Sequence, residues 1–190
     1  MAMIVGTEGI QDTLAGTDDD DVIWGGGMNQ PAGGDTLNGG GGRDLLLLSK
    51  GDVADGGRGD DTIAIIEHGG TITAHRGGGS DHILGFGAGD TFRFADLVSP
   101  REVALVSSQG NVVFNIGGLG GTAPDHNTIT LVGVSFDEVS FSFDEAGYFV
   151  IRGNTESSVA ASPIVPPATG SESVAATAPI VPVAETSPIA

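Results

Sequence analysis

Gly-Gly-Gly-Gly-Arg-Asp-Leu-Leu-Leu at residues 39–47 and Gly-Gly-Arg-Gly-Asp-Asp-Thr-Ile-Ala at residues 56–64 decide the fold of this chain. In both, a glycine-rich turn ends in an aspartate, and a large apolar residue follows two positions later. Residues 16–24 and 85–93 are close variants. Glycine lets the backbone turn tightly, and the apolar residue points inward from a three-residue strand while its neighbours point outward. The repeat predicts an all-β fold, a parallel β-roll in which two repeats make one coil.

The apolar position recurs throughout residues 6–97. Four of the eight intervals between successive positions are nine residues, which a flexible glycine-rich linker has no reason to maintain. The interval of 14 contains a five-residue insertion within Gly27–Gly33. The residues predicted to point into the roll are Leu14, Ile23, Leu37, Leu46, Val53, Ile63, Ile72, Ile83 and Phe92.

These repeats resemble the RTX (repeats-in-toxin, hemolysin-type) calcium-binding family, and the resemblance covers roughly residues 6–97. It implies that calcium is held between one turn and the turn two repeats later. It also implies that the ligands are the motif aspartates and the backbone carbonyls of the glycine-rich turns. The acidic composition fits this, because calcium prefers carboxylate and carbonyl oxygen.

We number the turns by the apolar position that follows each, from turn one before Leu14 to turn nine before Phe92. Odd and even turns are expected on opposite edges of the roll, because each turn stacks on the turn two repeats later. The even edge keeps the aspartate in every turn, so we expect about three calcium ions there. Turns five and seven of the odd edge lack it in this alignment, so only one more ion is expected on that edge, near Asp12 and Asp35. The predicted ligand residues are Gly16, Asp18, Asp21, Gly39, Gly41, Asp44, Gly56, Arg58, Gly59, Asp61, Gly79 and Asp81, with Asp12 and Asp35 on the odd edge.

The outward positions differ between the two sets of strands. Those after even turns are mostly apolar and include Val22, Trp24, Leu45, Leu47 and Leu84, whereas those after odd turns are mostly polar. A contiguous apolar face is usually covered. Two covers are considered: the chain's own C-terminal part, or a protein partner or second copy.

Composition excludes several function classes. The net charge of −18 disfavours nucleic acid, and the absence of cysteine removes disulfides and thiolate chemistry. No catalytic motif is present, so we expect no enzyme activity. The neighbours Ser80, Asp81 and His82 do not amount to a triad, and His68, His75 and His82 recur at a spacing of seven, which does not match the coil. No apolar run is long enough for a membrane helix or a cleaved signal.

Three segments follow from the changes in pattern. Residues 1–97 form the predicted calcium-binding roll. Residues 98–154 alternate like strands and form a predicted β cap, whose stretch 127–134 is similar to the terminal region of type I-secreted RTX proteins. Residues 155–190, rich in Pro, Ala and Val, are predicted to be an extended or disordered tail. The tail repeats Pro-Ile-Val-Pro, which suits a passive spacer or a bivalent docking peptide.

The expected function is calcium-coupled folding outside the cytoplasm, at the cell surface or beyond it, after export without a cleaved N-terminal signal. Once folded, the protein presents a surface for assembly or partner binding. Two alternatives are a non-catalytic accessory module of a type I-secreted enzyme, and a surface adhesin or ice-binding module. A regular outward row of threonine would favour the ice-binding module.

Overall fold

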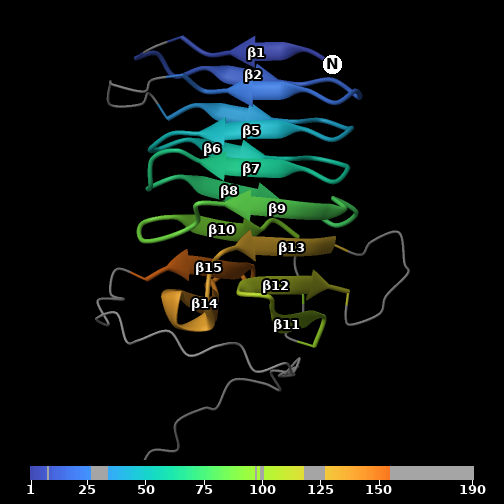
Figure 1. Ribbon diagram of the computed structural model, residues 1–190, viewed down its shortest axis with the longest axis vertical. Helices are drawn as coiled ribbons and strands as arrows, with labels where there is room; N and C mark the ends of the chain where they lie inside the picture. The colour runs from blue at the N-terminus through green and yellow to red at the C-terminus, as the bar shows by residue number, and fades with distance from the viewer. Residues whose placement is uncertain (8, 27–33, 97, 99–100, 118–126, 155–190) are drawn as a thin grey trace, which may run out of the picture.

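The computed structural model describes residues 1–7, 9–26, 34–96, 98, 101–117 and 127–154. It has two sheets that face each other across one core, with the strands stacked as rungs along the long axis (Figure 1). The predicted tail 155–190 and the insertion 27–33 lie outside the described residues. Among the described residues, the first sheet (sheet A) runs in the order β1-β3-β5-β7-β9-β13-β12-β11, and the second (sheet B) in the order β14-β15-β10-β8-β6-β4-β2.

Successive short strands alternate between the two sheets, which is the geometry that the nine-residue repeat predicts. Pairs such as β3 with β5 and β4 with β6 are parallel, so each coil lies directly on the one before it. The roll strands are β1 Met3–Val5, β2 Thr13–Ala15, β3 Val22–Trp24, β4 Thr36–Asn38, β5 Leu45–Leu48, β6 Val53–Asp55, β7 Thr62–Ile65, β8 Thr71–Ala74, β9 Ser80–Leu84 and β10 Thr91–Phe94.

Apolar side chains from both sheets fill the interior. Ile23, Leu46 and Ile83 of sheet A and Leu37 and Phe92 of sheet B are fully buried. Fully burying one aliphatic side chain stabilises the fold by roughly 1.5–3 kcal/mol, so a stack of single residues per strand supports a narrow roll.

One predicted inward position is wrong. Val53 points outward and is 36% exposed, whereas Ala54 is fully buried and pairs in register with Leu37 and Ile72. The strand is displaced by one residue from the predicted alignment, which moves every side chain to the opposite face. Both residues are apolar, so the sequence pattern did not distinguish them.

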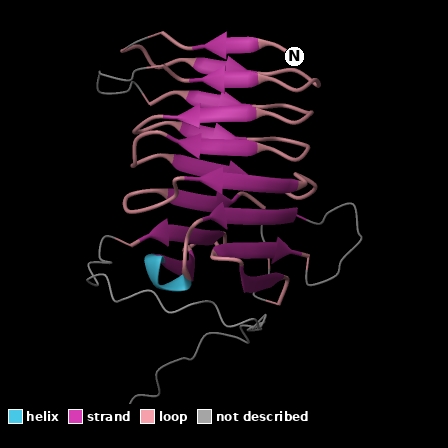
Figure 2. Cartoon of the chain, in the orientation of Figure 1, coloured by secondary structure: helices cyan, strands magenta, loops and turns pink. Residues whose placement is uncertain are grey.

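The cap extends the two sheets edge to edge rather than lying over them (Figure 2). In sheet A, β13 pairs in parallel with β9, and β12 and β11 follow antiparallel. In sheet B, β15 and β14 follow β10 antiparallel. The bounds are β11 Val103–Ser108, β12 Asn111–Ile116, β13 Asn127–Val132, β14 Val139–Phe143 and β15 Phe149–Gly153, with a single 3₁₀ turn, η1, at Phe136–Glu138.

Aromatic packing closes the end of the core under the cap. The fully buried Phe114 ring of β12 stacks on Phe92, at 6.3 Å between centroids, and meets Phe141 and Phe149 edge-on at 5.9 and 6.0 Å. Phe114 therefore joins the last coil of the roll to both cap sheets. A capped end also prevents the open strands from pairing with another chain.

Candidate metal centre on the even edge

The four even-edge aspartates form one continuous ladder. The Asp21 N–H donates to Asp44 Oδ1 at 2.7 Å, the Asp44 N–H to Asp61 Oδ1 at 2.8 Å, and the Asp61 N–H to Asp81 Oδ1 at 3.1 Å. All four residues are buried. The structure therefore brings together the four carboxylates that the repeat pattern singles out, one in each coil.

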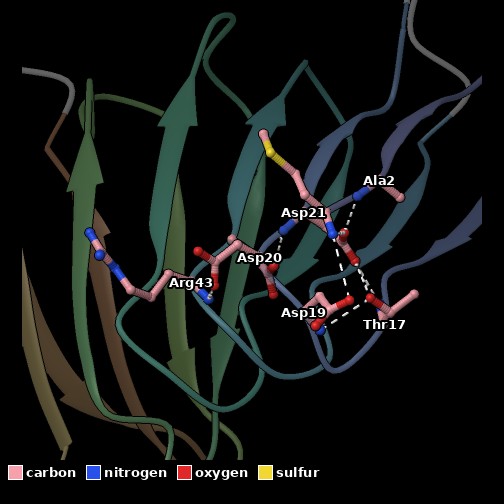
Figure 3. Close-up of polar contacts among 8 residues, drawn as sticks. Ala2, Thr17, Asp19, Asp20, Asp21 and Arg43 are labelled. Carbon is pink, nitrogen blue, oxygen red and sulfur yellow. Dashed lines mark hydrogen bonds and ion pairs between the residues drawn. The ribbon is translucent and has the colours of Figure 1, made fainter.

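The second carboxylate oxygens differ along this ladder. Asp21 Oδ2 accepts from the Thr17 N–H and hydroxyl, each at 2.8 Å, and its Oδ1 accepts from the Ala2 N–H (Figure 3). Asp44 Oδ2 and Asp61 Oδ2 are buried and have no hydrogen-bond partner. A buried carboxylate oxygen without a partner is costly, so these two positions suit a bound cation or a proton.

Glycine is required beside these oxygens because they occupy the space of a side chain. A Cβ built on Gly39 would lie 2.4 Å from Asp44 Oδ2 and 2.2 Å from the Gly56 carbonyl oxygen. One built on Gly56 would lie 2.4 Å from Asp61 Oδ2, and one on Gly16 would lie 2.1 Å from the Gly39 carbonyl oxygen. Carboxylate and carbonyl oxygens thus converge on the inner side of each turn.

The remaining predicted ligands lie on the outer part of the same turns. Gly41 forms a parallel bridge with Arg58 of the next coil, and a Cβ on Gly41 would lie 3.5 Å from Asp18 Oδ1. Gly59 and Gly79 continue this stack, because a Cβ on Gly79 would lie 2.1 Å from the Gly59 carbonyl oxygen. All twelve predicted even-edge residues therefore lie in the turns of one edge.

Burial disfavours the charged form of these carboxyls in the absence of a cation. It raises the pKa of Asp44, raises that of Asp61 to about 6, and raises that of Asp81 to about 7. Neighbouring carboxylates, Asp44 beside Asp61 and Asp61 beside Asp81, add to the rise. The pKa of Asp21 is lowered instead, chiefly by the hydrogen bond from the Ala2 N–H. A negative charge on the carboxyl groups of Asp44, Asp61 and Asp81 is therefore unfavourable in the absence of a cation.

The odd edge is more complete than the sequence predicted. The expectation that turn five lacks its aspartate is wrong, because with Ala54 inward the motif position is Asp52. Asp52 is fully buried, its Oδ1 accepts the Asp35 N–H at 2.9 Å, and Asp35 Oδ1 accepts the Asp12 N–H at 2.7 Å. A Cβ on Gly25 would lie 2.8 Å from both Asp35 Oδ2 and Asp52 Oδ2, so these two oxygens converge.

Two residues of this region were missed at the sequence level. Asp52 was hidden by the one-residue misalignment. Asn127 of β13 closes the even edge at the cap: its Oδ1 accepts the Gly77 N–H at 2.8 Å and its amide donates to the His75 carbonyl at 2.5 Å. The neutral Asn127 amide thus pairs with the Gly77 N–H and the His75 carbonyl of this turn. No sequence signal connects Asn127 with Gly77, which lies 50 positions earlier.

The donor set suits calcium. Within the described ranges, no three acidic or histidine side chains gather as a metal-binding group, so any site must combine two stacked carboxylates with backbone carbonyls. Such an all-oxygen set is what calcium takes, whereas zinc prefers nitrogen and sulfur. The unpartnered oxygens of Asp44 and Asp61 place the best fit at the middle of the even edge.

Comparison with known proteins adds little to this geometry. No protein-family model and no curated protein matches the sequence. Within the described part of the chain, no helix is both long and apolar enough to cross a membrane. Among solved structures, the chain is similar to the AlgE6R3 subunit of the Azotobacter vinelandii mannuronan C5-epimerase, with 24% identity over 87% of this chain and 93% of that chain. The TM-score of this match is 0.31. The β-roll is shown by the strand pairing described above.

Proposed function

We propose that this chain is a calcium-dependent β-roll of the RTX type, which folds when calcium enters the turns of the even edge. The observation that carries this proposal is the pair of buried carboxylate oxygens, Asp44 Oδ2 and Asp61 Oδ2, that no hydrogen bond satisfies. Calcium would be held by stacked pairs of aspartates, Asp21 with Asp44, Asp44 with Asp61, and Asp61 with Asp81, together with glycine carbonyls. A further position between Asp35 and Asp52 has the same donor types.

Calcium acts on the folding equilibrium. Without it, the stacked carboxylates repel one another and the 33 glycines make ordering of the backbone costly in entropy. An ion that binds only the folded state stabilises that state by about 2.7 kcal/mol per site when its concentration is 100 times the dissociation constant. Several sites in series therefore turn calcium into a folding switch.

The physiological role of this switch follows from calcium concentrations. A cytoplasm low in calcium would keep the chain unfolded for export, and a calcium-rich exterior would fold it. We therefore assign the working location to the cell surface or the extracellular space, and assign no catalytic activity to the protein.

The outer face of sheet A supports a role in assembly. Six residues align across six neighbouring strands in one apolar row, namely Val5, Trp24, Leu47, Ala64, Leu84 and Val132. Val22 and Leu45 begin a second row. Val5 is 49% and Leu84 39% exposed, and the described cap strands extend the sheet without covering this face. We propose that it binds a partner protein or a second copy.

The alternatives are weaker for specific reasons. The outward row of sheet B reads Thr13, Thr36, Val53, Thr71 and Thr91, so the row of threonines breaks at Val53, after turn five. The adjacent row contains Asn38, Asp55 and Arg93, and these break the flat, uncharged surface that ice binding needs. An accessory module of a secreted enzyme would use the same calcium chemistry, and linkage to a catalytic domain would distinguish it.

Circular dichroism in excess EDTA and in millimolar calcium tests the folding proposal, with isothermal titration calorimetry to count the ions. We expect most of the β signal to develop on adding calcium and to be lost again in chelator. Magnesium at equal concentration controls for ionic strength. A full β signal in EDTA, together with no heat of calcium binding, refutes the proposal.

Sedimentation in calcium tests the assembly proposal. The double variant Trp24→Ser, Leu84→Ser on the apolar row is compared with Thr13→Ser, Thr36→Ser on sheet B. A wild-type complex, either with itself or with a captured partner, should be lost only in the first variant. If the two double variants behave alike, the outer face of sheet A is not the interface.

A further inference from the structure

The odd edge ends in an aspartate whose surroundings differ from those of Asp44 and Asp61. Asp90 ends turn nine, and its side chain is fully buried. Its Oδ1 accepts from the Gly69 N–H at 2.8 Å and the Gly70 N–H at 3.3 Å. Its Oδ2 accepts from the Gly87 N–H at 2.9 Å and lies 2.7 Å from His68 Nδ1. Both oxygens therefore have partners, whereas Oδ2 of Asp44 and Oδ2 of Asp61 have none.

His68 comes from turn seven, the one turn whose motif position, Gly70, lacks the aspartate. Its ring lies over the backbone of turn nine, since a Cβ built on Gly87 would be 3.0 Å from the ring carbon Cε1. An ionised carboxylate only accepts hydrogen bonds, so Nδ1 must carry the proton. The ring is 57% exposed and covers a carboxylate that is 0% exposed.

We propose that the His68 side chain takes the place of calcium between turns seven and nine, so that this coil is closed by an internal donor and binds no metal. In the turns of Asp44 and Asp61, one buried carboxylate oxygen lacks such an internal donor. Here one imidazole supplies the missing donor from the turn that lost its aspartate. The inference extends the calcium proposal above and rests on it only for the comparison between turns.

The charged groups near the ring are mostly acidic. Asp90 faces it directly, and Glu67 is its neighbour in the chain. Glu67 also contributes to the raised pKa of Asp52 in the preceding odd turn. One cation is near: the stem of Lys50 reaches the backbone at Gly69, where a built Cβ would lie 3.1 Å from Lys50 Cγ. The imidazole thus lies among acidic side chains, where its Nδ1–H donates to Asp90 Oδ2.

The closed coil is continuous with the cap. The Asp90 carbonyl accepts the Gly153 N–H at 3.1 Å, Ala88 forms a bridge with Gly153, and β10 pairs with β15. Above it, β10 pairs with β8, the strand that follows His68. The His68–Asp90 pair thus fastens the last coil of the roll to the cap without calcium, and we expect β8, β10 and β15 to remain ordered when the even edge is emptied.

Hydrogen exchange by mass spectrometry of the full chain tests this in EDTA. We expect amides of β8, β10 and β15 to stay protected while those of β3, β5 and β7 exchange at unfolded rates. In His68→Ala, the protection of β8 and β10 in EDTA should fall at least tenfold. The matched control is His82→Ala, whose exposed histidine lies on the outer face of sheet A and should leave this protection unchanged.

A second variant gives a gain of binding. His68→Asp places a carboxylate opposite Asp90, so calorimetry with calcium chloride should count one more ion than in the wild type. Terbium located by anomalous scattering in wild-type crystals should appear beside Asp44 and Asp61 and not beside Asp90. A terbium peak at Asp90 in the wild type overturns the inference, as does loss of β8 and β10 protection together with the rest of the roll in EDTA. Absence of terbium from the even edge refutes the calcium proposal instead, and the exchange data still decide the role of His68.

Discussion

Asp61→Asn should stabilise the calcium-free protein and destabilise the calcium-loaded one. Asparagine keeps the oxygen that accepts the Asp44 N–H and removes the charge at the unpartnered Oδ2. Burial raises the pKa of Asp61 from 3.8 to about 6, so at pH 8 its charge lowers the free energy of unfolding by up to about 3 kcal/mol, at 1.36 kcal/mol per pH unit. Solvent at the rim of the turn screens part of this, and we expect a gain of about 1.5 kcal/mol in chelator.

In calcium the sign reverses. Asp61 belongs to two of the stacked aspartate pairs, so its carboxylate serves two proposed ions. Each ion contributes about 2.7 kcal/mol at 100 times its dissociation constant. Weakening both sites should therefore lower the free energy of unfolding by roughly 3–5 kcal/mol.

Folding of the calcium-free chain by added trimethylamine oxide in EDTA, and urea unfolding in calcium, measure the two effects, both at pH 8 and followed by circular dichroism. Glu145→Gln is the matched control, because it removes one charge from an exposed turn of the cap. Its effect should stay within about 0.5 kcal/mol under both conditions. The reasoning fails if Asp61→Asn shifts stability in the same direction with and without calcium.

Three further predictions use the same assays. In EDTA, lowering the pH from 8 to 5 should lower the trimethylamine oxide concentration at the folding midpoint: the folded-state pKa values of about 6 for Asp61 and about 7 for Asp81 exceed the unfolded value, so the folded state binds these protons more tightly and stability is lost as the pH rises through 6–7. A need for more trimethylamine oxide on acidification contradicts this. Gly39→Ala should cost more than about 2 kcal/mol, because its Cβ meets two oxygens at 2.4 and 2.2 Å, whereas Gly70→Ala, with nothing nearer than 3.4 Å, should cost under about 1 kcal/mol. Similar losses of stability in the two variants would show that the turn at Gly39 relaxes around the added methyl group. Leu46→Ala, fully buried in a middle coil, should cost about 2–5 kcal/mol, and Leu84→Ala, 39% exposed, far less; equal losses would count against the inward and outward assignment of sheet A.

Much of the fold could be predicted because the repeat carries its own geometry. A turn of glycines, an aspartate and an apolar residue two positions later specify which side chain points inward and which lies at the edge. Asp21, Asp44, Asp61 and Asp81 align in space as they align in sequence, and residues 98–154 contain the strands that their alternation predicts. Local residue type and spacing are sufficient wherever the period is kept.

Where the repeat spacing is irregular, only contacts between neighbouring coils decide which residue points into the core. Val53 and Ala54 are both apolar neighbours, and pairing with Leu37 and Ile72 selects Ala54, which in turn makes Asp52 a member of the odd-edge ladder.

The hydrogen-bond partners of individual carboxylate oxygens likewise could not be predicted from the sequence. Asp44 and Asp90 occupy the same place in their repeats, yet one has a bare buried oxygen and the other meets His68 across 22 residues of chain. Residue type and spacing place a carboxylate in each turn, but whether it needs a cation depends on what the adjacent coil brings to within hydrogen-bond distance, and that distance exists only once the coils have stacked.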